Sequence, residues 1–291
     1  MLSAQSAEPG RQAARVTFYR PAPALCDLIE SYSIFEVTRP VRDLLPPGWM
    51  HSGWIVEGAW MSGPVGGELA PVPPATLSGP YERAVIVQGS ASRVIALTIT
   101  PPGWTTLVGA RAAPFAGRAT PMSATLGPEC DSLLPQLRGA SDARALDLLD
   151  EFFLARVRGV AAAERVTRAY ALLRDAEVRT VDDWSRRLGI SPRHLERVCD
   201  RHFGLRPKRL LRRERLLRTL EEVRRVPPSA WLEAIGDAYA DQSHFVREFR
   251  WFMHMTPGAW LRHERGLDRR VSKRVALADV GFVQSDPGAL G

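Results

Sequence analysis

The stretch SPRHLERVCDRHFGLRP, at residues 191–207, decides the fold of the second half of this chain, because DQSHFVREFRWFMHMTP repeats its pattern at residues 241–257. Each stretch opens with a residue that can cap a helix and closes with proline. Matching positions carry His194/His244, Arg197/Arg247, Pro207/Pro257, Leu195/Phe245, Cys199/Phe249 and Phe203/Met253. The chain therefore contains two copies of one helical unit.

The first copy has the signals of two short helices joined by a turn. Thr180 and Asp183 have the spacing of a capping box, with Asp in place of Glu or Gln, and open the helix VDDWSRRL, which Gly189 closes. Ser191 then caps a second helix, which Gly204 ends. A helix, a short turn and a helix form the arrangement that places the second helix in the major groove of DNA.

A long basic helix joins the two copies. It reads PKRLLRRERLLRTLEEVRR, starts at Pro207 and ends before the proline pair at 227–228, which gives it a length of about 28 Å. One turn of DNA is about 34 Å long, so this helix can hold two reading helices in successive major grooves. In the second copy we expect caps at Ser229 and Asp241, and a closing helix after residues 256–257.

The outward faces of the second helix in each copy carry the predicted DNA contacts. Arg197 and Arg247 can pair bidentately with guanine, Glu196 can accept from cytosine, and the arginines further along each helix suit phosphates. Gln242 can read adenine bidentately. The predicted DNA-binding residues are Pro192, Arg193, His194, Glu196, Arg197, Arg201, Lys208, Gln242, Ser243, His244, Arg247 and Arg250.

The start of the joining helix has two equal interpretations. Lys208, Arg209, Arg212 and Arg213 either touch backbone phosphates or form a solvated basic face.

Charge is divided unevenly along the chain. Residues 1–155 have a net charge of −3, residues 156–274 of +12, and residues 275–291 of −2. Such asymmetry favours an anionic partner for the basic part, nucleic acid first and a membrane surface second. An arginine-rich solvated surface is the alternative.

The part before residue 124 is predicted to be rich in β-structure. Short apolar runs at 31–37, 52–58, 84–89 and 93–100 are separated by many Gly and Pro residues, which is typical of a small antiparallel barrel or sandwich. With the helical C-terminal part this gives an α+β fold. The expected division is a disordered lead-in at 1–15, a β-rich sensor or dimerisation domain at 16–123, a helical linker at 124–160, a DNA-binding domain at 161–267 and a flexible tail at 268–291.

Nothing in the β-rich part indicates enzyme chemistry. Its aromatic residues either line a ligand pocket or, as we prefer, form the core: Tyr32, Phe35, Trp49, Trp54, Trp60, Tyr81 and Trp104. There is no G-x-S-x-G, phosphate loop or H-E-x-x-H, and His51 is the only histidine before His194, so no metal or cofactor is expected. We likewise expect no metal at His194 or His244.

The cysteines and the ends of the chain give further expectations. Cys26, Cys130 and Cys199 lie far apart without a C-x-x-C pair, which favours free buried thiols. With no long apolar run and no leader pattern, a soluble cytoplasmic protein without membrane contact is expected. The helical pattern at 124–158 either joins the domains, forms a dimer interface or packs into the core.

The motifs GISPRHLERV, GLRPKRLLRRER and AYADQSHFVREFR resemble those of the AraC/XylS family of bacterial transcription regulators. The resemblance covers about residues 161–265 and extends weakly to the LSGP turn at 77–80 and the Pro-Pro-Gly at 101–103. It implies two helix-turn-helix subdomains joined by a helix, a promoter as partner, and a β-rich N-terminal domain that senses an effector or dimerises.

This chain departs from the family pattern at three positions. The family usually has glycine at Ala238 and His254, where turns end two helices of the second copy, and phenylalanine at Cys199 in the core of the first copy. Two turns must therefore be made without the residue that best tolerates positive φ.

The leading hypothesis is a sequence-specific, DNA-binding transcription regulator that is modulated through its N-terminal domain. Possible further partners are a small-molecule effector, RNA polymerase and a second copy of the chain. The alternatives are an enzyme or ligand-binding module with a DNA-binding appendage, and an adaptor whose basic helices bind an acidic protein.

Overall fold

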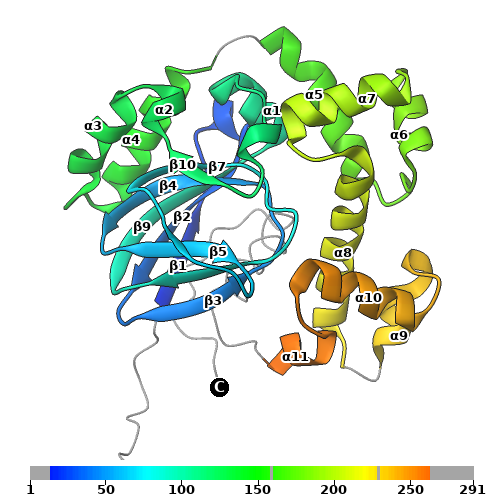
Figure 1. The fold of residues 1–291 in the computed structure, drawn as a ribbon. Coiled ribbons are helices and arrows are strands. Elements are labelled where there is room, and N and C mark those ends of the chain that lie inside the picture. Colours follow the sequence, from blue (N-terminus) through cyan, green and yellow to red (C-terminus); the bar gives the residue numbers. More distant parts are fainter. Residues whose placement is uncertain (1–13, 158–159, 228–229, 263–291) are drawn as a thin grey trace, which may run out of the picture.

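A computed structural model describes residues 14–157, 160–227 and 230–262. A β-rich N-terminal half lies beside a column of helices formed by the C-terminal half (Figure 1). The predicted lead-in, residues 1–15, falls outside the described residues except at its end. Ala14 and Arg15 are not part of a disordered lead-in, because they open β1 (Ala14–Tyr19) and pair with β2 (Ile29–Val37).

Two antiparallel sheets form the N-terminal half. The larger sheet has the order β1, β2, β9 (Ser92–Ile99), β4 (Met50–Glu57), β7 (Ala75–Ser78) and β10 (Ala119–Pro121). The smaller sheet has the order β3 (Val41–Leu45), β8 (Val85–Gly89), β5 (Trp60–Pro64) and β6 (Ala70–Pro71). The four predicted runs correspond to β2, β4, β8 and β9, so the antiparallel β-prediction is confirmed.

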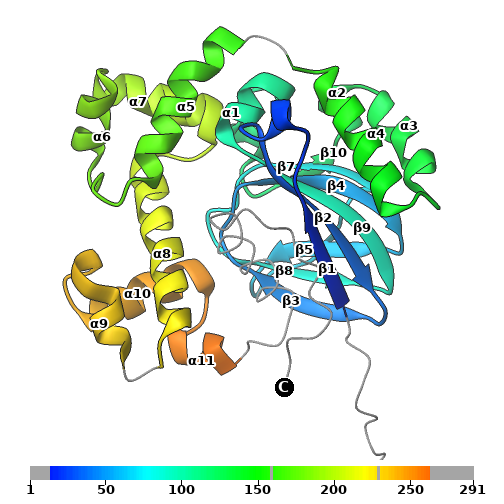
Figure 2. The same cartoon turned by 180° about the vertical axis from the view of Figure 1, so that it is seen from behind.

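Three helices cover the outer face of the larger sheet (Figure 2): α2 (Ser123–Leu126), α3 (Glu129–Leu137) and α4 (Asp142–Leu154). Ser141 caps α4 by accepting from the Arg144 amide. The Trp54 indole donates to the Cys130 carbonyl at 2.8 Å, and its ring meets Phe152 and Phe153 edge-on. Of the interpretations offered for 124–158, core packing is therefore the correct one for α3 and α4.

The segment after β9 is helical, which the sequence did not indicate. Thr100 caps α1 (Pro101–Gly103), and the chain continues as a π-helical turn at Trp104–Val108. Its prolines had suggested only the end of a strand. The prediction of buried thiols is correct for Cys130 and Cys199 but wrong for Cys26, which follows a short turn at Pro23–Leu25 and is exposed.

The C-terminal half follows the predicted order of helices. It contains α5 (Val160–Arg174), α6 (Val181–Leu188), α7 (Pro192–Val198) continuing as a π-helical turn at Cys199–Phe203, α8 (Pro207–Arg225), α9 (Trp231–Ile235), α10 (Gln242–Met253) and α11 (Pro257–Arg262). We call α6, α7 and the π-turn the first unit, and α9 and α10 the second unit.

Side-chain caps start the helices where the sequence predicted them. Thr180, Ser191, Asp241 and Thr256 each accept a hydrogen bond from the amide three residues on, at 2.6–3.2 Å. These bonds satisfy amides that a helix leaves unpaired in its first turn. The predicted cap at Ser229 lies outside the described residues.

The turns at the helix ends differ from expectation at one position. Gly189 and Gly204 end their helices with φ of 75°, as predicted. His254 takes the same left-handed conformation, with φ of 57°, and is the only such non-glycine in the described ranges. Ala238 does not: the residue with positive φ after α9 is Gly236, with φ of 50° and ψ of −144°, and Ala238 ends a 3-10 turn, Gly236–Ala238.

Candidate nucleic-acid interface

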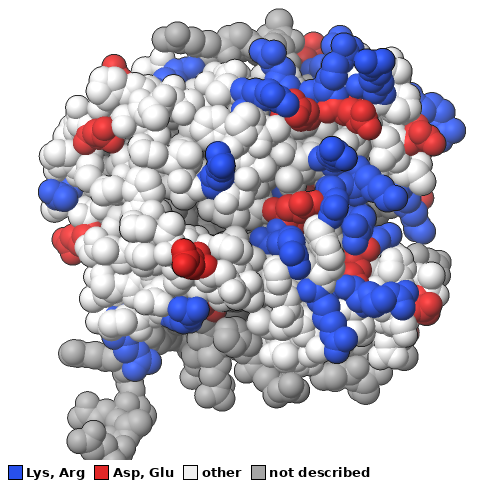
Figure 3. Space-filling view, viewed as in Figure 1, with Lys and Arg blue, Asp and Glu red and all other residues white. Residues whose placement is uncertain are grey.

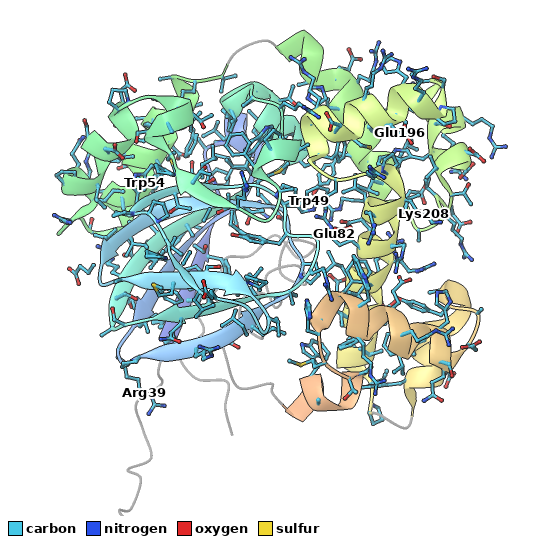
Figure 4. All side chains as sticks on the ribbon, viewed as in Figure 1. Arg39, Trp49, Trp54, Glu82, Glu196 and Lys208 are labelled. Atoms are coloured by element: carbon cyan, nitrogen blue, oxygen red, sulfur yellow. The ribbon has the colours of Figure 1, made fainter. Side chains whose placement is uncertain are left out.

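The first unit presents one face of α7 to solvent. Leu195, Val198, Cys199 and Phe203 are buried, as predicted from their spacing. The predicted contacts on this helix are exposed except for half-buried His194: Pro192, Arg193, Glu196, Arg197 and Arg201. Figure 4 shows Glu196 on the side of α7 that faces away from the N-terminal half.

The second unit repeats this arrangement. Phe245, Phe249 and Phe252 of α10 are buried, and the predicted contacts are exposed apart from half-buried His244: Gln242, Ser243, Arg247 and Arg250. The N-terminal turn of each second helix is thus open to a partner, which is the end that reads base edges in helix-turn-helix proteins.

A basic groove of about 990 Å³ separates the two units along α8. In Figure 3, the Lys and Arg side chains gather over the half of the molecule that contains the groove. Lys208 points outward from α8 in Figure 4. The cationic residues that line the groove are Arg179, Lys208, Arg212, Arg215, Arg218 and Arg247, with His244 beside them. Among the residues for which DNA contact was predicted or considered, the groove brings together Lys208, Arg212, His244 and Arg247.

Arg179, Arg215 and Arg218 were missed by the sequence analysis. The signal for the last two was available, because residues 212, 215 and 218 recur every three positions and so share a face of α8. Nothing in the sequence places Arg179 there, since it belongs to the segment before α6.

Two of the predicted basic contacts on α8 face the N-terminal half instead. The side chain of Arg213 has no exposed surface, donates to the Gly48 carbonyl at 3.1 Å and stacks on Trp49, with its guanidinium carbon 3.8 Å from the ring centre. Arg209 pairs with Glu82 at 3.3 Å. Both interpretations are wrong for Arg213, because a buried side chain can neither touch a phosphate nor form a solvated face. Arg209, one helical turn away, lies on the same face of α8 (Figure 4 shows Trp49 and Glu82 there).

An ionic network fixes α10 to α8. The Glu248 side chain is 3% exposed and accepts from Arg212 at 3.2 Å and from Arg215 at 2.7 Å. His244, one turn earlier on α10, lies 3.6 Å from the same carboxylate. A buried carboxylate held by two guanidiniums orients the helix, and Arg247, the residue before it, remains exposed.

Carboxylates in the first unit are also held in the charged state. Arg186 and Arg187 beside Asp183 lower the pKa of its carboxyl below the usual value, and Arg111 does the same for the pKa of Asp200. Burial and neighbouring Arg201 lower the pKa of His202 to about 4, so this imidazole is neutral at pH 7.

A separate apolar cavity of about 180 Å³ lies between the two sheets. Phe35, Trp60 and Tyr81 line it, whereas Tyr32, Trp49, Trp54 and Trp104 are buried core residues, so the aromatic residues are divided between the two roles proposed for them. Ser52 borders the cavity, but it pairs with Leu77 and Leu97, so its side chain points, like that of Trp54, to the helix-covered face of the sheet. The cavity is suited to a small apolar molecule.

The part of the chain that the structure describes offers neither a metal site nor a membrane-spanning helix. The described residues contain no group of three or more His, Cys, Asp or Glu side chains placed to hold a metal ion. None of their helices combines the length and apolarity needed to cross a membrane.

Comparison with known proteins supports the helical units. Residues 184–263 match the family described as a helix-turn-helix domain. Among curated proteins no relative matches the sequence.

Solved structures of similar arrangement were also found. They include ToxT from Vibrio cholerae O395, at 11% identity and a TM-score of 0.44 over 86% of this chain and 98% of ToxT. Another is the AraC-like transcriptional activator CuxR, at 15% identity and a TM-score of 0.30 over 76% of this chain and 85% of CuxR. ToxT has also been solved with (E)-4-(8-methylnaphthalen-1-yl)but-3-enoic acid bound.

The two capped units on one joining helix and the helix-turn-helix match define the class of this protein as a DNA-binding transcription regulator. In this chain the helix-turn-helix domain is joined to a β-rich N-terminal half.

Proposed function

We propose that this regulator reads two successive major grooves of a promoter, with α7 in one and α10 in the next. The observation that carries the proposal is the pair of recognition helices with open N-terminal turns on either side of a basic groove. Phosphates between the two major grooves then lie along Lys208, Arg218 and Arg179. Contacts of this kind supply most of the affinity, and base contacts supply the specificity.

Footprinting on the promoter of the protein's own gene and on the adjacent promoters tests this proposal. Titration of the protected DNA with single variants of the protein then measures each affinity. Arg197→Ala and Arg247→Ala are each expected to cost about 1–3 kcal/mol on the cognate site and to leave non-specific binding almost unchanged. Arg42→Ala is the matched control, because Arg42 is exposed on β3 and bonds to Gln88. Equal losses on specific and non-specific DNA would make the two arginines phosphate contacts.

Absence of any protection at low salt would overturn DNA reading and favour the adaptor hypothesis, in which the basic helices bind an acidic protein. The enzyme hypothesis finds support only if the chain turns over a small molecule.

We further propose that the cavity between the sheets binds a small apolar effector. Its lining supports this, because Phe35, Ile55 and Val94 face it and a ligand can bury apolar surface against them. A thermal-shift screen with phenol and short aliphatic alcohols tests it. We expect stabilisation of the wild type that is reduced in Ala96→Leu, because the larger side chain fills part of the cavity, and equal stabilisation of both proteins contradicts binding there.

RNA polymerase and a second copy of the chain are the remaining expected partners. We propose that the regulator acts in the cytoplasm on promoter DNA, where it meets RNA polymerase, and that its β-rich half at 16–123 supports effector binding or pairing with a second copy. Light scattering of the full chain with and without promoter DNA tests the pairing.

A further inference from the structure

The N-terminal half covers the C-terminal ends of both recognition helices. The last carbonyls of any helix lack partners within the helix, and they are normally satisfied by water or by a local turn. In this protein, donor groups from residues 80–84 bond to carbonyls at the end of α10, and donor groups from residues 105–112 bond to the end of the first unit. Both ends are therefore held by the N-terminal half, through different residues.

At the end of α10, a guanidinium and an amide from the N-terminal half act as the missing donors. Arg83 Nε donates to the Trp251 carbonyl at 2.7 Å, and the Ala84 amide donates to the Phe252 carbonyl at 2.8 Å. The guanidinium of Arg83 also lies 5.0 Å from the ring centre of Trp251 and 3.3 Å from Nδ1 of His254. It thus contacts the strained left-handed residue that ends the helix.

At the end of the first unit, the donors come from residues 105–112. The Ala112 amide donates to the Arg201 carbonyl at 2.8 Å, and the Thr105 hydroxyl lies 2.8 Å from Nδ1 of His202. Arg111 forms a two-pronged pair with Asp200, with Nη2 to Oδ1 at 2.7 Å. Two parallel bonds fix direction as well as distance.

One loop of the N-terminal half reaches both units. A Cβ built on Gly204, which ends the first recognition helix, would lie 2.8 Å from Cγ of Pro80. Three residues further on, Arg83 contacts the second unit. A pocket of about 650 Å³ beside this loop is lined by Leu205 of the first unit and His254 of the second. Residues 80–84 therefore bridge the two reading helices.

The contacts of Arg83 are remote from the base-reading, N-terminal end of α10. Gln242 and Trp251 are nine residues apart on α10, which is about 14 Å along the helix. Arg83 is accordingly not placed to touch the bases that Gln242 faces. Its contacts determine where the C-terminal end of α10 lies, and hence the direction in which its N-terminal end points.

We propose that Arg83 and Arg111 are positioning residues for DNA reading: Arg83 holds α10, and Arg111 holds α7, in the relative orientation that two successive major grooves require. The inference rests on the proposed function, because it needs two reading helices. It adds that the N-terminal half is part of the reading apparatus. Tyr81 within this loop and Val85 directly after it line the apolar cavity, so an effector in the cavity touches the segment that holds α10.

The test compares Arg83→Ala, Arg111→Ala and the control Arg42→Ala in the full chain on a promoter fragment with two protected half-sites. Footprints of Arg197→Ala and Arg247→Ala first assign each half-site to its helix. Arg83→Ala is expected to weaken only the half-site of α10, and Arg111→Ala only that of α7, each about threefold, because both side chains are exposed. Arg42→Ala should change neither.

Salt dependence separates positioning from direct contact. Loss of a phosphate contact lowers the slope of log K against log salt by about 1, whereas loss of a positioning contact leaves the slope unchanged. Equal weakening of both half-sites, no weakening, or a reduced slope would overturn the proposal. The exchange of Arg111 and Asp200, as the double variant Arg111→Asp with Asp200→Arg, should restore the half-site that Arg111→Asp weakens.

Hydrogen exchange without DNA keeps the two proposals distinguishable. Arg83→Ala should speed amide exchange in the last turn of α10 and leave α7 unchanged, and Arg111→Ala should do the reverse. Unchanged exchange in both variants contradicts the positioning role even if DNA is bound. If the wild type protects no pair of half-sites, the proposed function fails, while the exchange experiment still decides whether these arginines hold the helices.

Discussion

The two helix-turn-helix units share a sequence pattern but depend differently on the rest of the molecule. The first unit belongs to the main core: Trp184, Leu195 and Phe203 pack in one cluster with Trp54 and Phe153 of the N-terminal half. The second unit has its own core of Phe245, Phe249, Phe252 and Trp260, to which the N-terminal half adds Leu44 and Ala84. One recognition helix is thus built into the N-terminal half, and the other is attached to it.

This difference explains how the first unit accommodates the small Cys199 side chain. Phe203 lies edge-on to Trp184 and to Trp49, which comes from the N-terminal half, and Trp49 also meets Tyr170 of α5 at 5.3 Å. Aromatic surface from another part of the chain completes this core. The second unit needs no such help, because its three phenylalanines supply the surface themselves.

Trp49→Ala and Phe249→Ala are expected to have the largest effects on the stability of the two units. Both side chains are buried, and each truncation is expected to lower the free energy of unfolding by about 3–5 kcal/mol. Urea denaturation measures the loss, and hydrogen exchange locates it. Trp49→Ala should open α6 and α7, although Trp49 lies outside the unit, whereas Phe249→Ala should open α9 to α11. Equal loosening of both units by either variant would show that they share one core.

Arg213→Ala, compared with Arg209→Ala, tests how α8 is bound to the N-terminal half. Removal of the buried guanidinium leaves Glu214 and the Gly48 carbonyl without their partner and is expected to cost about 3 kcal/mol in unfolding. Arg209→Ala should cost less than about 1 kcal/mol, since that pair is partly exposed. A reduced salt slope for DNA binding by Arg213→Ala would contradict its interface position.

His254→Gly tests whether the left-handed residue at the end of α10 costs stability that Gly204, at the end of the first recognition helix, does not cost. Glycine adopts positive φ without strain, as at Gly204, so this variant is expected to raise the stability of the second unit by about 0.5–1 kcal/mol. Thermal denaturation of the wild type and the variant checks it. A lower melting temperature would mean that the contact of His254 with Arg83 outweighs the strain.

The smallest expected effect is the pH dependence of the first unit. The pKa of His202 is about 4 in the folded chain and about 6.5 when unfolded, so the unfolded state binds more protons between these values. The contribution of neutral His202 to the free energy of unfolding is fully present above pH 6.5 and is lost as the pH falls towards 4. We expect this loss to be less than about 1 kcal/mol, because solvent screens a partly exposed group. Denaturation of the wild type and His202→Gln at pH 7 and 5 measures it; equal pH dependence of the two proteins contradicts the assignment.

The sequence allowed much of the C-terminal half to be predicted, because its signals are local. Caps at Ser191 and Asp241, the stop at Gly204 and the apolar spacing of each recognition helix depend on neighbours within a few residues. The helix that starts at Pro101 was missed, since its turn is capped by Thr100 in a proline-rich context that also suits the end of a strand.

Local sequence by itself thus determined that this chain contains two capped helix-turn-helix units on one basic helix. Only the tertiary structure decided which basic residues remain available to DNA. Arg212 and Arg213 are adjacent and equally charged, yet one lines the groove and the other is buried against Trp49. The physical reason is that periodicity defines the faces of a helix, while the packing of residues more than a hundred positions away decides which face is covered.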